Sequence, residues 1–361
     1  MKGSNKDSFG TATSRRVTEL DGLRGIAALW VVLYHLWAAV ARRDVDWLTS
    51  AVGEFFHAGW LGVDIFFVLS GFVITHSVTK TRVTSAFIPR FILRRSIRID
   101  PPYWAAIILA IFFMVLKNLL FPSESVVVPS AQVVIAHIFY LQNLLELGNI
   151  SSVFWTLCLE FQFYIFFAIS YYFYSFLGQE NKKRVSYILL ITGIAACFFS
   201  PILRFSSFNF PLPGTIFPYA YEFILGIIAY HCSKGRIGYK YLIFSVLGSV
   251  VVTSMFKPFY YGVVPLLTLL VIYVASEGKR ILVLNVRSVQ FLGKISYSLY
   301  LTHAVVGWVV ISLLSYLLED YQSKAVTVLI FFSGMSSSIL FAFLFFKIIE
   351  YPSLAFSKRF K

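Results

Sequence analysis

The stretch LDGLRGIAALWVVLYHLWAAV, residues 20–40, has the length of a membrane span and carries ionisable groups on one face. Arg24 and His35 are eleven residues apart, which in a helix is about three turns and about 16 Å of rise. Asp21 lies one turn before Arg24 and joins the same stripe. Because such groups are costly in lipid, we expect the stripe to face protein or a water-filled cavity, where it can carry chemistry.

Composition indicates that the rest of the chain is of the same kind. The 361 residues are 58% hydrophobic and only 13% charged, and the mean hydropathy is +0.77. A soluble domain rarely has this composition. Apolar runs of about 17–25 residues, the length of a membrane helix, recur along nearly the whole sequence.

We therefore predict an all-α polytopic membrane protein with ten spans and cytoplasmic N- and C-termini. Residues 1–19 and 351–361 are expected to be cytoplasmic tails on either side of one transmembrane domain, 20–350. The expected spans are 20–40, 57–79, 102–121, 153–177, 186–203, 215–232, 240–256, 259–276, 295–317 and 325–350.

The distribution of basic residues sets the expected orientation, because short cytoplasmic loops are rich in Lys and Arg. The apolar stretch 131–147 is interpreted as a short, non-spanning helix on the outer side, since crossing would carry the basic cluster at 182–184 outside. With this topology, the outer segments hold only Arg42, Arg43, Arg204, Lys257 and Lys324. The net charge of +14 then reflects topology and contact with anionic lipid. We expect no nucleic-acid partner.

The three cysteines, Cys158, Cys197 and Cys232, lie in or at the end of apolar runs and form no CxxC pair. Buried thiols of this kind are usually packing residues. We therefore expect neither a disulfide framework nor a metal site.

Four ionisable residues on four different spans fall at a similar expected depth in the outer half of the membrane: His35, Asp64, Glu160 and Glu222. A carboxylate near an imidazole can orient it and hold its proton, as general-base catalysis requires. The alternative is that each residue simply bonds a neighbouring helix.

A second group of interest is the run Arg90–Trp104 on the expected cytoplasmic side. Arg95 and Arg98 are three residues apart and share a helical face. Guanidinium groups bind phosphate with a geometry that lysine lacks, so this face suggests a nucleotide-phosphate site, whereas its alternative role is to grip lipid phosphates. Pro101 and Pro102 then suit the start of the next span.

Two further motifs contribute candidate residues. Ser70, followed by Gly71, allows a helix or an acyl chain to approach the backbone closely. His303 ends the motif ISYSLYLTH, residues 295–303, and is expected nearer the cytoplasmic side, where it contacts a donor headgroup or caps a packing network. Tyr164, one turn after Glu160, is a candidate hydrogen-bond donor to an oxyanion.

Taken together and in order, these motifs resemble the acyltransferase 3 family of integral membrane O-acyltransferases. The resemblance rests on LDGLRGIAA with His35, an Arg-x10-His signature; FFVLSGF at 66–72; Arg95-x-x-Arg98; Trp155-Thr156-Leu157 with Glu160; and SYSLYL at 296–301 with His303. It covers residues 20–350.

The resemblance implies an enzyme of the inner membrane that moves an acyl group, often acetyl, from cytoplasmic acyl-CoA to a hydroxyl of a saccharide or glycolipid-type acceptor. By its match to the signature, His35 would be the catalytic base, and Arg24, Arg95 and Arg98 would engage the donor's phosphates or fix the site. From the residues themselves, we expect Asp64 and Glu160 to assist His35. The other candidates for binding donor or acceptor are Ser70, Tyr164, Glu222 and His303. Acyl-CoA would be a co-substrate, with no permanently bound cofactor. Direct transfer and an acyl-histidine intermediate both stay open, as does association into homo-oligomers.

Two other functions fit the intramembrane His and Glu residues. A proton-coupled transporter or flippase of a glycan or lipid intermediate would use them as a proton relay. An acyl-CoA sensor would bind the donor and leave it intact. Consumption of acyl-CoA by the purified protein discriminates the enzyme from both.

The topology can be tested by thiol labelling. In a variant whose three native cysteines are serine, Lys182→Cys should react with a membrane-impermeant reagent only from the cytoplasmic side, because the basic cluster at 182–184 is expected inside. Lys257→Cys, expected outside, is the control and should react in intact cells. Labelling of Lys182→Cys in intact cells would mean that 131–147 crosses the membrane.

Overall fold

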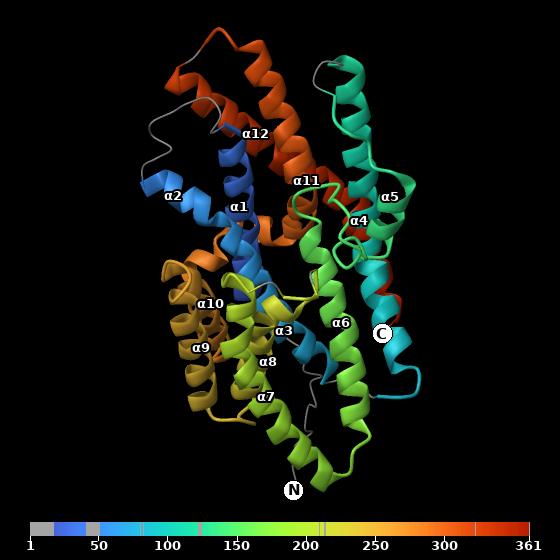
Figure 1. Ribbon diagram of the computed structural model, residues 1–361, viewed down its shortest axis with the longest axis vertical. Coiled ribbons are helices and arrows are strands. Elements are labelled where there is room, and N and C mark those ends of the chain that lie inside the picture. The colour runs from blue at the N-terminus through green and yellow to red at the C-terminus, as the bar shows by residue number, and fades with distance from the viewer. Residues whose placement is uncertain are drawn as a thin grey trace, which may run out of the picture.

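The computed structural model describes residues 18–40, 51–79, 81, 83–121, 125–208, 210–212, 214–321 and 323–360, and every regular element in these ranges is helical. The all-α prediction is therefore confirmed for this part of the chain (Figure 1). The α-helices are α1 (Thr18–Val40), α2 (Ala51–His57), α3 (Gly62–Val78), α4 (Phe87–Leu120), α5 (Ala131–Ile138), α6 (Trp155–Ser175), α7 (Gln179–Phe205), α8 (Ala220–Ser233), α9 (Tyr239–Ser254), α10 (Tyr260–Ser276), α11 (Arg287–Leu317), α12 (Lys324–Phe345) and α13 (Tyr351–Ser357).

Seven helices of the described part are long and apolar enough to cross a membrane. They are Thr18–Val40, Val52–Val78, Phe87–Leu120, Trp155–Ser175, Gln179–Phe205, Arg287–Leu317 and Lys324–Ser357. The other three predicted spans correspond to α8, α9 and α10, which have 14, 16 and 17 residues. At about 1.5 Å per residue these helices are shorter than the hydrocarbon core, which is about 30 Å thick. The chain is thus a multi-pass helical protein, and its described part has seven candidate spans, three fewer than the ten that the sequence predicts.

Helix α5 agrees with the interpretation that 131–147 does not cross. It has eight residues, so it is about 12 Å long. The side chain of Ser130 caps its first turn by accepting a hydrogen bond from the backbone N–H of Val133.

Helix α4 corrects one prediction. Pro101 and Pro102 lie inside an unbroken helix of 34 residues and do not begin a span. The prolines lack N–H groups, so the carbonyls of Ile97 and Arg98 lose their usual helical donors, yet the chain continues as a helix through them. The arginines before the prolines are therefore part of the same rod as the apolar half of α4.

Close packing of α1 against α11 organises the centre of the bundle. A Cβ atom added to Gly25 would lie 2.5 Å from the backbone nitrogen of Gly293, so only glycine allows this approach. Further along, Leu36 touches Gly307. Since later residues of one helix meet later residues of the other, α1 and α11 run parallel.

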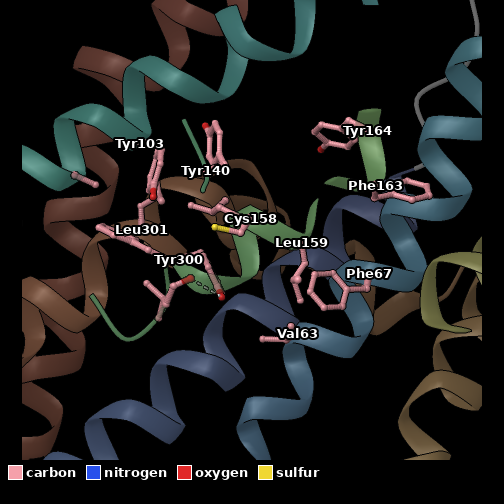
Figure 2. Packing of buried hydrophobic residues seen from close by; sticks show 14 of the residues in the cluster. Val63, Phe67, Tyr103, Tyr140, Cys158, Leu159, Phe163, Tyr164, Tyr300 and Leu301 are labelled. Carbon is pink, nitrogen blue, oxygen red and sulfur yellow. Dashed lines mark hydrogen bonds between the residues drawn. The ribbon is translucent and has the colours of Figure 1, made fainter. Parts of the chain in front are cut away.

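Helices α3 and α8 are in similarly close contact. A Cβ atom on Gly71 would overlap the carbonyl of Phe223, which confirms the prediction that Ser70-Gly71 allows close helix approach. Figure 1 shows α7 to α10 gathered on one side of α3, with α4 and α5 on the other. In the largest core cluster, Phe67 of α3 lies beside Leu159 of α6 (Figure 2).

The structure describes most of the predicted C-terminal tail but little of the predicted N-terminal tail. Of the predicted N-terminal tail, residues 1–17 lie outside the described residues, and Thr18 begins α1. Tyr351–Phe360 of the predicted C-terminal tail is helical, and α13 packs against α4.

Candidate active site

A cavity of about 80 Å³ lies among α1, α3, α4, α6 and α11. Several water molecules would fit in this volume. Six of the predicted site residues line it, and they come from four helices, α1, α3, α4 and α6: Arg24, Ser70, Arg95, Arg98, Glu160 and Tyr164. We call it the arginine cavity. The grouping of Arg24 with Arg95 and Arg98 is the arrangement expected of a phosphate site.

Local helix geometry explains how these side chains reach one space. Arg95 and Arg98 are nearly one turn apart on α4, as are Glu160 and Tyr164 on α6, so each pair projects from one face. The exposed Arg94 next to them is not part of the cavity wall.

The carboxylate of Glu160 is held inside the cavity. It accepts a hydrogen bond of 2.9 Å from the Ser70 hydroxyl and a short one from the Tyr164 hydroxyl. Tyr164 thus orients Glu160 in this structure. The hydrogen bonds of Glu160 are thus made on the arginine side, with Ser70 and Tyr164, and none joins it to His35 among the described residues.

Arg95 is fixed by stacking as well as by hydrogen bonding. Its guanidinium lies over the rings of Phe91 and Tyr164, at 5.4 and 5.5 Å from their centroids. It also donates a 3.1 Å hydrogen bond to the Ser77 hydroxyl. A planar guanidinium held between aromatic faces keeps part of its donor set available.

The cavity has more positive than negative charge. Three guanidinium groups face a single carboxylate, that of Glu160. Neither Arg24 nor Arg98 is hydrogen-bonded to another residue in the part of the chain that the structure describes. Because partly enclosed guanidinium groups need hydrogen-bond acceptors, the arrangement favours an anionic ligand or water.

The imidazoles of His35 and His303 are in direct contact. Nδ1 of His35 lies 3.1 Å from Nε2 of His303 and 3.0 Å from the carbonyl oxygen of Val31. His303 is fully buried, and its Nδ1 lies 2.9 Å from the carbonyl oxygen of Leu299. The indole N–H of Trp308 donates to the backbone carbonyl of His35 at 3.2 Å.

This contact corrects the depth predicted for His303. Helix α11 starts at Arg287, eight residues before the predicted start, so His303 is a full sixteen residues into it. His35 is seventeen residues into α1. Because the two helices are parallel, the two imidazoles meet at one level, and His303 does not lie nearer the cytoplasmic end.

One aromatic layer separates the His pair from the arginine cavity. Tyr300 lines the cavity, and the centroid of its ring lies 6.1 Å from that of His303. Phe66 also lines the cavity and packs edge-on against Tyr300 at 5.7 Å. The Tyr300 hydroxyl is 2.7 Å from that of Thr156.

Asp64 and Glu222 belong to a different cluster, centred on Arg204. The guanidinium of Arg204 lies 2.9 Å from Asp64 and 2.5 Å from Glu222, and its side chain is only 6% exposed. Asp64 and Glu222 do meet, as their shared depth predicted, but they pair with a cation and make no hydrogen bond to His35 among the described residues.

Sequence reasoning missed Arg204 because it was counted as an outer-loop charge. The structure places it in the last turn of α7. A signal was present: two carboxylates in apolar spans need a cation, and Arg204 follows an apolar run.

This is a multi-pass membrane protein whose central helices bring a cationic cavity next to two contacting imidazoles, those of the partly exposed His35 and the buried His303. The profile of the acyltransferase domain family, acyltransferase 3, matches residues 17–347. The chain belongs to this family, whose members transfer acyl groups.

Similar proteins carry related names. A Staphylococcus aureus (strain COL) protein with the provisional name O-acetyltransferase SACOL0978 is 27% identical over 375 residues, covering 94% of this chain and 57% of the relative. The O-acetyltransferase OatA of S. aureus (strain NCTC 8325 / PS 47) is 29% identical over 168 residues, covering 43% of this chain and 24% of OatA. The chain thus spans little more than half the length of the first relative. No solved structure matches it.

The Arg204 cluster should be needed for folding. Arg204→Leu leaves two buried carboxylates without a cation, which we expect to destabilise the protein by about 3–5 kcal/mol. Thermal unfolding in detergent would measure the loss. Arg184→Leu on the exposed face of α7 is the control. Adding Asp64→Asn and Glu222→Gln to Arg204→Leu should recover part of the stability; no recovery would show that the carboxylates are not the cause.

Proposed function

We propose that this protein is a membrane O-acyltransferase that moves an acyl group, in the first instance acetyl, from cytoplasmic acyl-CoA to a hydroxyl of a saccharide or glycolipid-type acceptor. The observation that carries the proposal is the cationic cavity, separated by a single aromatic layer from the contacting imidazoles of His35 and His303. Membership of the acyltransferase family supports the class of reaction.

The arginine cavity supports acyl-CoA as the donor. The donor's phosphates are anionic, and guanidinium groups bind phosphate oxygens with two parallel hydrogen bonds. The N–H groups of Arg24 and Arg98 make no hydrogen bond to another described residue, so they can bind phosphate. The guanidinium of Arg95 is already oriented by stacking. By the positive-inside pattern, α4 presents these arginines towards the cytoplasm, where acyl-CoA is available.

His35 is proposed to act as the general base. It takes the proton of the acceptor hydroxyl as the oxygen attacks the thioester carbon. A C–O bond forms, the C–S bond breaks, and the proton passes from His35 to the departing sulfur, so that free CoA thiol is released. In the alternative, the acyl group rests on His35 between the two steps.

The aromatic layer implies a movement during the reaction. Tyr300 and Phe66 lie between the cavity and the His pair, so a thin pantetheine arm reaches His35 only when one of them turns aside. Tyr164 donates its hydrogen bond to Glu160, and it becomes an oxyanion donor only by exchanging that hydrogen bond.

His35→Ala should abolish transfer while the protein still inserts and folds. Loss of a general base typically costs about 10²–10⁴-fold in rate. The measurement is acetyl transfer and CoA release by purified protein in nanodiscs. His76→Ala, a histidine in α3 that packs against Tyr230, is the matched control. Wild-type rates in His35→Ala would contradict the mechanism, and gradient-driven substrate flux without CoA release would favour a transporter.

Arg95→Ala and Arg98→Ala should weaken donor binding more than the chemical step. Loss of a hydrogen bond to a charged group is worth about 1.5–3 kcal/mol, so KM for acetyl-CoA should rise about 10- to 100-fold. Arg94→Ala is the control from the same motif, because Arg94 is exposed and outside the cavity. If KM stays unchanged in both variants, these arginines do not bind the donor phosphates.

A further inference from the structure

The His35–His303 contact joins two imidazoles that are far apart in sequence, and backbone carbonyls determine where each carries its proton. A carbonyl oxygen only accepts hydrogen bonds, so a ring nitrogen facing one must be a donor. Nδ1 of His35 faces the carbonyl of Val31 at 3.0 Å. Nδ1 of His303 faces the carbonyl of Leu299 at 2.9 Å. Both rings therefore carry a proton on Nδ1.

This assignment fixes the direction of the hydrogen bond between the rings. A neutral imidazole with its proton on Nδ1 has a lone pair on Nε2. Nε2 of His303 lies 3.1 Å from Nδ1 of His35, so His303 accepts and His35 donates, sharing its N–H with the carbonyl of Val31. If Nε2 of His303 were also protonated, its N–H would point at the N–H on Nδ1 of His35 and neither could accept. The contact therefore requires a neutral His303.

We infer that His303 is a positioning residue that holds His35 with Nε2 as its reacting nitrogen. The inference rests on the proposed function, in which His35 is the base. Within the described residues, the hydrogen bonds of the His35 ring all use Nδ1, so the lone pair on Nε2 is left for the acceptor hydroxyl. A neutral imidazole thus takes the orienting role that a carboxylate often plays beside a catalytic histidine.

In the proposed step, every proton is accounted for without a change in the protonation of His303. The acceptor O–H proton moves to Nε2 of His35, which becomes an imidazolium. Its Nδ1–H bond to the lone pair of His303 stabilises that charge. When the C–S bond breaks, the same proton moves from Nε2 to the sulfur, and His35 returns to its starting tautomer.

The place of His303 in the fold supports a geometric role. It is fully buried in α11, whereas the arginine cavity lies beyond Tyr300. The close packing at Gly25 and Gly293 keeps α1 and α11 in register. Substitution of His303 should therefore change the rate of the chemical step and leave the affinity for the acyl donor unchanged.

The experiment compares two variants at this position. His303→Leu removes the acceptor, and we expect kcat to fall about 10- to 100-fold, the worth of one hydrogen bond to a charged group, with KM for acetyl-CoA unchanged. His303→Gln provides a carbonyl oxygen near the position of Nε2 and should recover most of kcat. If the role of His303 is merely structural, folded yield and thermal stability should fall in both variants. In that case kcat should not be higher in His303→Gln than in His303→Leu.

The wild-type protein offers a second measurement that needs no folded variant at position 303. In protein labelled with ¹⁵N-histidine, the neutral rings of His35 and His303 should both show a protonated Nδ1 and an unprotonated Nε2. The His35 signals are assigned by their loss in His35→Ala. An Nε2–H on either ring, or unchanged kcat in a folded His303→Leu, would overturn the inference. Activity in His35→Ala would instead overturn the proposed function.

Discussion

The close approach of α1 to α11 is the contact on which the rest of the site depends. At Gly25 and Gly293 the two backbones come too near for any side chain. Two parallel helices held at this distance present Arg24 to the cavity at one level and His35 to His303 about three turns further on. One packing contact between small residues, the usual means of close helix approach in membranes, therefore sets both halves of the site.

The protein buries its charges in two different ways. Arg204 is matched by two carboxylates, and its side chain is almost fully enclosed. The arginine cavity has three guanidinium groups and one carboxylate. The first arrangement is closed and joins α3, α7 and α8. The second has more guanidinium groups than carboxylates in its lining, which favours water or an anion there, and this difference is the reason for proposing the cavity, and not the Arg204 cluster, as a ligand site.

Much of the candidate site could be predicted because its residues follow short-range rules. Spacings of three, four and eleven residues put Arg95 with Arg98, Glu160 with Tyr164 and Arg24 with His35 on common faces, and all of these pairs keep that relation in the structure. The expected shared depth of His35, Asp64, Glu160 and Glu222 did not bring all four into one site, because depth says nothing of the direction in which a side chain points. Asp64 and Ser70 are six residues apart, so they face directions about 120° apart on α3, one towards Arg204 and the other towards the arginine cavity.

Sequence alone determined that the chain is an all-helical membrane protein, that the first span has a polar stripe and that α4 has a basic face, because periodicity and hydropathy are local properties. Only the tertiary structure decided the partners: His303 for His35, Arg204 for Asp64 and Glu222, and Ser70 for Glu160. These contacts join residues up to 268 positions apart. They depend on helix direction, tilt and register, which packing determines and no spacing within one helix encodes.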